Sequence, residues 1–102
     1  MRYQFLLAFI LLTNSFCVSS STSEAHNIKI ITNNWTSQIV LSYITGNIFE
    51  KMGYPVTYQE TAISEQWGAL SHSISDVQIE VWEGTMATQF NRMVKEGHFL
   101  NA

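Results

Sequence analysis

Residues 28–59 read IKIITNNWTSQIVLSYITGNIFEKMGYPVTYQ, and their pattern predicts a strand, a helix and a second strand. Ile28–Thr32 is short, rich in β-branched residues and followed by two asparagines, which is typical of a β-strand. Across residues 36–52 apolar side chains recur every three or four positions, which predicts an amphipathic helix. Gly46 inside this helix indicates a close packing contact, because glycine otherwise destabilises a helix. A glycine and a proline end the helix, and residues 56–59 form the next predicted strand.

The remainder of the chain continues the alternation of strands and helices. Residues 63–70 predict a short helix, residues 77–82 alternate as a strand does, and residues 85–97 predict a last helix. The predicted order is β-α-β-α-β-α, which indicates an α/β fold with a parallel sheet and right-handed crossovers. In such sheets, ligands bind beyond the carboxyl ends of the strands.

Composition narrows the class of function. The chain has 102 residues, of which 46% are hydrophobic and 13% charged, and this is a globular composition rather than a disordered one. Five basic residues stand against eight acidic residues, a net charge of -3, which argues against a nucleic-acid partner. A single cysteine excludes a disulfide-stapled or cysteine-rich zinc module.

The first 25 residues have the layout of a secretory signal peptide. Met1 and Arg2 are followed by an apolar run at residues 5–12, which is too short for a bilayer span, and then by small polar residues. We therefore expect a signal peptide at 1–25, cleaved after Ser20 or Ala25, and a secreted or periplasmic domain at 26–102. An uncleaved membrane anchor or a core strand is the alternative for this segment.

Two tryptophans leave predicted strands at the same edge of the predicted sheet. Trp35 follows the first strand and Trp82 ends the third. Two indoles at that edge can form part of an aromatic box for an apolar or cationic ligand. Their spacing alone favours the alternative that both cover the end of the sheet as core. Trp67 lies within a predicted helix and is expected to pack in the core.

Two predicted helix starts face the same edge. The backbone N–H groups at Thr36–Ser37 and at Gly84–Thr85–Met86 can bind a carboxylate or phosphate, and the Thr36 and Thr85 hydroxyls add donors. Ordinary capping is the simpler explanation of these residues. Aromatic faces for a cation beside donors for an anion suit a small zwitterion, so Trp35, Trp82, Thr36 and Thr85 form the predicted ligand site.

Other chemistry is poorly supported by the sequence. Glu80 and Glu83 resemble a carboxylate pair for acid–base catalysis, but one lies in a predicted strand and the other in a loop, so a structural role is favoured. The three histidines have no metal-ligand spacing, and no phosphate loop or nucleophile motif is present. We therefore expect no enzyme activity, no metal and no cofactor. Asn34–Trp35–Thr36 is also an N-glycosylation sequon.

The chain from about residue 28 to its end resembles the N-terminal part of the substrate-binding proteins of glycine betaine, choline and carnitine ABC importers. The resemblance rests on Asn34–Trp35–Thr36, on the helix end at residues 49–56 (FEKMGYPV), and most specifically on residues 76–86 (DVQIEVWEGTM). It implies part of one lobe of a type II periplasmic-binding fold. It also implies a quaternary ammonium ligand held by Trp35 and Trp82, and a membrane permease as partner.

Members of that family are two-lobed, and 102 residues are fewer than two lobes need. We therefore expect a truncated binding component of an importer. The alternative is a secreted, non-catalytic interaction or remnant module that has lost ligand binding, and glycosylation of Asn34 would favour it.

Overall fold

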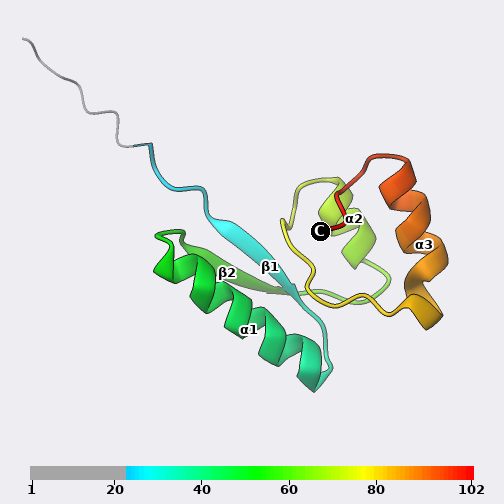
Figure 1. Cartoon of the computed structure of the whole chain (residues 1–102), viewed down its shortest axis with the longest axis horizontal. Helices are drawn as coiled ribbons and strands as arrows, with labels where there is room; N and C mark the ends of the chain where they lie inside the picture. Colours follow the sequence, from blue (N-terminus) through cyan, green and yellow to red (C-terminus); the bar gives the residue numbers. More distant parts are fainter. Residues whose placement is uncertain (1–22) are drawn as a thin grey trace, which may run out of the picture.

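The computed structural model describes residues 23–102, which form two strands and three helices (Figure 1). The elements in chain order are β1 Ile28–Thr32, α1 Thr36–Lys51, β2 Val56–Glu60, α2 Gln66–Ser71 and α3 Glu83–Lys95. The two strands are parallel neighbours, with Ile28 opposite Val56 and Thr32 opposite Glu60. The α/β class and the first β-α-β unit are therefore confirmed.

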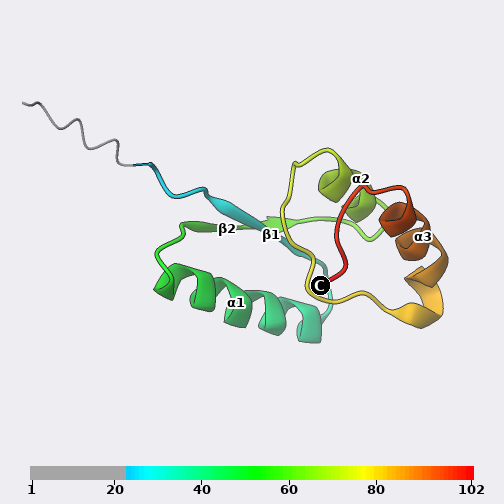
Figure 2. The same ribbon diagram turned by 45° about the horizontal axis from the view of Figure 1, so that its top comes forward.

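Helix α1 covers one face of the sheet, and α2 and α3 lie beyond the ends of the strands. Figures 1 and 2 both show α2 and α3 past the arrowheads of β1 and β2. In the same views α1 and α3 begin on the same side of the molecule. The carboxyl ends of the strands therefore open toward two helix starts.

The predicted third strand at residues 77–82 is wrong as a regular element. Only one isolated parallel bridge, between Ile30 and Val77, joins this segment to β1. Two backbone hydrogen bonds form this bridge. The Ile31 N–H donates to the Val77 oxygen (2.9 Å), and the Val77 N–H donates to the Lys29 oxygen (3.2 Å). After Val77 the segment leaves the sheet without further ladder bonds.

Side-chain amides take the backbone groups that a longer third strand would need. The Ile31 oxygen accepts from Gln38 Nε2 (2.8 Å), and the Asn33 N–H donates to Gln38 Oε1 (2.8 Å). On the other segment, the Ile79 N–H donates to Gln78 Oε1 (3.1 Å). In a parallel ladder these groups would pair with each other, so their side-chain partners end the ladder at one bridge.

Helix α1 buries its polar face rather than its apolar one. Gln38, Ser42 and Gly46 are its buried residues, spaced four apart along one side. The large apolar side chains of the helix are mostly half exposed, including Val40 at 50%, Ile44 at 52% and Ile48 at 55%. Since two residues turn a helix by about 200°, the stripe that begins at Val40 lies opposite the one that begins at Gln38.

Gly46 makes the close packing contact expected of it. A Cβ added to Gly46 would lie 2.8 Å from Tyr58 Cζ and closer still to the Tyr58 hydroxyl oxygen. The Tyr58 ring is held in place by stacking on Tyr43, with ring centroids 4.1 Å apart. Glycine therefore lets α1 lie directly on β2.

A separate apolar cluster joins α2 and α3. Trp67, Met86 and Met93 are buried at its centre, and Trp35, Val81, Phe90 and Phe99 pack around them. The packing role expected for Trp67 is confirmed, since its ring stacks on Phe99 with centroids 6.0 Å apart. This cluster anchors the helices beyond the ends of the strands.

The signal-peptide prediction for residues 1–25 lies outside the described residues, apart from its last three positions. Within residues 23–102 no helix is long and apolar enough to cross a lipid bilayer.

Replacement of Gln38 tests the role of its amide. Q38A leaves the Ile31 oxygen with only its 3.2 Å bond from Ser42 Oγ and leaves the buried Asn33 N–H without its acceptor. We expect a loss of about 1–3 kcal/mol in the free energy of unfolding, measured by urea denaturation. The control Q89A removes a glutamine whose bond to Arg92 is exposed and should change stability by less than about 0.5 kcal/mol. Equal stability of the two variants would contradict this role.

A pair of glycine substitutions tests the contact between α1 and β2. G46A should destabilise the protein by about 1–3 kcal/mol, because the new methyl group overlaps the Tyr58 ring. A methyl group added to Gly68 in α2 would meet no atom within 4 Å, so G68A should stabilise by up to about 1 kcal/mol through helix propensity. Thermal unfolding measures both, and a G46A variant as stable as G68A would refute the contact.

Candidate functional site

The four residues of the predicted ligand site line one pocket. Trp35, Thr36, Trp82 and Thr85 surround a hollow of about 560 Å³, together with Ser37, Ile63 and Met86. Trp35 and Thr36 come from the start of α1, and Trp82 and Thr85 from the start of α3. The structure therefore brings together two tryptophans that lie far apart in the chain.

The two tryptophans differ in burial. Trp35 is half-buried and packs against the Trp67 cluster. Trp82 is 56% exposed. The alternative that both tryptophans serve only as core therefore fits Trp35 in part and does not fit Trp82, whose ring is open to solvent at the pocket.

Glu80 joins the two indoles. The Trp82 Nε1–H donates to Glu80 Oε1 at 2.6 Å, and the Trp35 Nε1–H donates to Glu80 Oε2 at 3.2 Å. The Ser37 hydroxyl donates to the same carboxylate, at 3.0 Å from Oε2 and 3.3 Å from Oε1. One carboxylate thus ties Trp82, Trp35 and the first turn of α1 to each other.

Sequence reasoning missed this role of Glu80, although a signal for it was present. Side chains two residues apart in an extended segment point to the same side. Gln78 bonds Gln38 at 2.8 Å and Glu80 bonds Trp35, so both point toward the start of α1. Since Trp82 continues that alternation, the spacing indicated that Glu80 and Trp82 share a side of the segment, but it did not identify the partners of the carboxylate.

These hydrogen bonds control the ionisation of Glu80. Desolvation raises the pKa of the carboxyl, but hydrogen bonds from Trp82, Trp35 and Ser37 lower the pKa by more, so it falls below its usual value. Glu80 is therefore a carboxylate at neutral pH. The start of α1 has no acidic residue in its own first turn, so Glu80 supplies the negative charge that a helix N-terminus favours.

The helix starts differ in detail from their predicted form. Trp35 and Trp82 occupy the N-cap positions of α1 and α3, and neither side chain caps the backbone of its own helix. The expected capping by Thr36 or Thr85 is therefore wrong, because both lie inside the first turn. The Met86 N–H is also no free donor, since it bonds the Trp82 oxygen at 2.9 Å.

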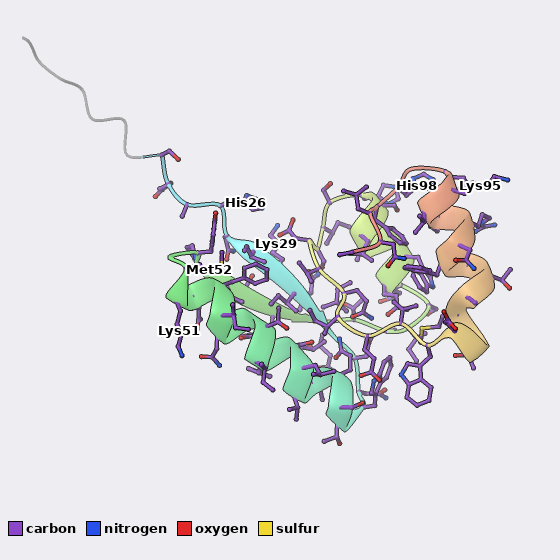
Figure 3. The ribbon with its side chains drawn as sticks, viewed as in Figure 1. His26, Lys29, Lys51, Met52, Lys95 and His98 are labelled. Atoms are coloured by element: carbon purple, nitrogen blue, oxygen red, sulfur yellow. The ribbon has the colours of Figure 1, made fainter. Side chains whose placement is uncertain are left out.

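The charges around the pocket are acidic rather than basic. Of the described residues that line it, none is basic. Lys51 and Lys95 lie in the last turns of α1 and α3, and Figure 3 shows both at the helix ends away from the two tryptophan-bearing starts. Glu83 stands in the first turn of α3. The pocket itself is therefore lined by aromatic, apolar and hydroxyl side chains, and the carboxylate of Glu80 lies beside it on the two indole N–H groups.

The Glu80 carboxylate is engaged in hydrogen bonds at the start of α1. Both oxygens of Glu80 already accept hydrogen bonds from tryptophan side chains. Among residues 23–102 no group of three or more His, Cys, Asp or Glu side chains is placed to hold a metal ion.

A second hollow adjoins the pocket and is more polar. Its volume is about 840 Å³, and it shares Ile63, Thr85 and Met86 with the first. Asn34, Glu60, Thr61, Ser64 and Gln89 contribute its polar groups. Aromatic and polar surfaces are therefore continuous on this side of the molecule.

Comparison with known proteins points to one family. Residues 26–102 match the substrate binding domain of the ABC-type glycine betaine transport system, OpuAC. The chain is also 31% identical over 80 residues to the trimethylamine N-oxide-binding protein of Pelagibacter ubique (strain HTCC1062). That alignment covers 78% of this chain and 26% of the relative, so the chain spans about a quarter of the relative's length. No solved structure matches the chain.

The family match extends over both helix starts, both tryptophans and Glu80. Members of such a family bind a substrate and do not transform it, in agreement with the resemblance seen in the sequence. The chain belongs to the substrate-binding domains of ABC-type glycine betaine transport systems.

Proposed function

We propose that residues 26–102 form part of one lobe of the substrate-binding component of an ABC importer, and that this lobe holds a trimethylated nitrogen cation against Trp35 and Trp82. The observation that carries the proposal is the pocket lined by both tryptophans and by both helix starts. Aromatic faces attract quaternary ammonium groups by cation–π interaction.

The ligand class follows from the chemistry of the pocket. Glycine betaine and choline carry a trimethylammonium group, and the relative from Pelagibacter ubique is named for trimethylamine N-oxide, which also has a trimethylated nitrogen. We propose that the rings of Trp35 and Trp82 contact this trimethylated nitrogen. The absence of basic side chains from the described lining favours recognition of the cation over recognition of a carboxylate.

The polar end of the ligand requires hydrogen-bond donors. The Thr36 and Thr85 hydroxyls line the pocket, and the adjoining hollow adds Asn34, Ser64 and Gln89. The first-turn N–H groups of α1 and α3 have no acceptor within their own helices and are further donors. These groups suit a hydroxyl, an N-oxide oxygen or a carboxylate held at the outer side of the pocket.

The remaining parts of the role rest on the family. Substrate-binding components work outside the cytoplasm and deliver their ligand to a membrane permease, and a signal peptide at residues 1–25 would direct this chain there. Since Trp82 is 56% exposed, we propose that other parts of the whole binding protein cover the open side of the ligand.

Calorimetry tests the proposed ligand class. We expect the folded chain to release heat with choline, glycine betaine or trimethylamine N-oxide at millimolar concentration. W82A should weaken binding roughly two- to fivefold, the worth of about 0.5–1 kcal/mol for a cation on an exposed ring.

The matched control is Y54A, which removes another exposed aromatic ring, one that packs edge-on against Phe49 and does not line the pocket. Y54A should bind as the unaltered chain does. Absence of heat with all three ligands, in protein shown to be folded by circular dichroism, would refute the proposal for this chain. Equal affinity of W82A and Y54A would refute the role of Trp82.

A further inference from the structure

We infer that Glu80 is the positioning residue of this pocket: its carboxylate holds the indoles of Trp35 and Trp82 in one arrangement and makes the pocket select for a positively charged ligand group. The inference deepens the proposed function and rests on it.

The geometry leaves little freedom to the two rings. Each carboxylate oxygen of Glu80 accepts from a different indole, at 2.6 Å from Trp82 and 3.2 Å from Trp35. A ring that is only packed can turn about its side-chain torsions, but a ring also held through its N–H keeps its face in one direction. Trp82 benefits most, because its ring is more than half exposed and has little packing to hold it.

The charge of Glu80 acts on the ligand through the indoles. A carboxylate that accepts from an indole N–H pushes electron density into the ring, and a more negative ring face attracts a cation more strongly. The carboxylate also places a negative charge behind both rings, where none of the described pocket-lining residues is basic. An uncharged ligand of the same shape gains nothing from either effect.

Glutamine cannot replace Glu80 in this role. Its side chain has one acceptor oxygen and one donor NH₂ group, whereas Glu80 faces three donors: two indole N–H groups and the Ser37 hydroxyl. In E80Q at least one indole N–H therefore loses its acceptor, and the negative charge is lost as well. The volume of the side chain is nearly unchanged.

Two measurements on the same variants test the inference. The first is the pair of indole N–H resonances of Trp35 and Trp82 in a ¹H–¹⁵N spectrum, with Trp67, the third tryptophan, as an internal reference. We expect E80Q to shift both resonances upfield and to leave that of Trp67 in place. The matched control is E50Q, which removes an exposed charge in the last turn of α1, at the other end of that helix from the pocket, and it should shift neither.

The second measurement compares choline with its uncharged carbon isostere, 3,3-dimethylbutan-1-ol. E80Q should lower the affinity for choline about tenfold and that for the isostere less than about twofold. E50Q should leave the ratio of the two affinities within about twofold of that of the unaltered chain.

The outcomes separate the inference from the proposed function. Unmoved indole resonances in E80Q, or an equal loss of affinity for both compounds, would overturn the inference even if choline binds. If the unaltered chain binds neither compound, the proposed function fails, and so does the inferred selectivity for a positively charged ligand. The indole resonances in that case still show whether Glu80 holds the two rings. If E80Q does not fold, W82F is measured instead, because it removes the Trp82 N–H. A shift of the Trp35 indole resonance would show that the two indoles share the Glu80 carboxylate. An unmoved Trp35 resonance would refute this.

Discussion

Two hydrogen bonds between the Gln38 amide and the backbone at the end of β1 determine where the sheet stops. One amide both accepts from the Asn33 N–H and donates to the Ile31 oxygen, so it occupies two successive ladder positions. A third strand can then pair with β1 at only one bridge, and the segment after Val77 turns away from the sheet. That segment carries Glu80 and Trp82 to the start of α1. The geometry of the pocket is therefore a consequence of how β1 ends.

A buried network of polar side chains stabilises the end of β1 and the helices next to it. Asn33, Gln38, Gln66 and Gln78 are linked by side-chain hydrogen bonds, and Gln38 and Gln66 are fully buried. Because a buried amide without partners is costly, such a network is stable only when its members are all placed together. It therefore specifies one position of α1 and α2 relative to β1. The apolar side chains of α1 are left on the opposite face, where this part of the protein does not cover them.

The pocket has aromatic faces, and a carboxylate bonds the indole N–H groups of both its tryptophans. Its aromatic rings supply the apolar, polarisable surface that suits methyl groups, and Glu80 behind them supplies a negative charge that suits the nitrogen they surround. Its helix starts would ordinarily favour an anion, but Glu80 and Glu83 stand at these starts. The balance of charge thus favours the cationic end of a ligand, and the match to glycine betaine binding domains agrees with this chemistry.

Sequence patterns were sufficient to predict the elements that depend on near neighbours: β1, α1, β2, their parallel connection and the edge where Trp35 and Trp82 leave the extended segments. These follow from side-chain periodicity and from the chirality of the crossover, which act over a few residues or one connection. Three features instead required contacts between distant parts of the chain: which face of α1 is buried, where the third strand stops, and the bonds of both tryptophans to Glu80. Each of these depends on a partner far along the chain, such as Tyr58 for Gly46 or Trp35 for Glu80. Local sequence patterns do not identify such distant partners. Apolar periodicity indicates which side chains can be buried, but it does not indicate which polar groups will bond the neighbouring backbone.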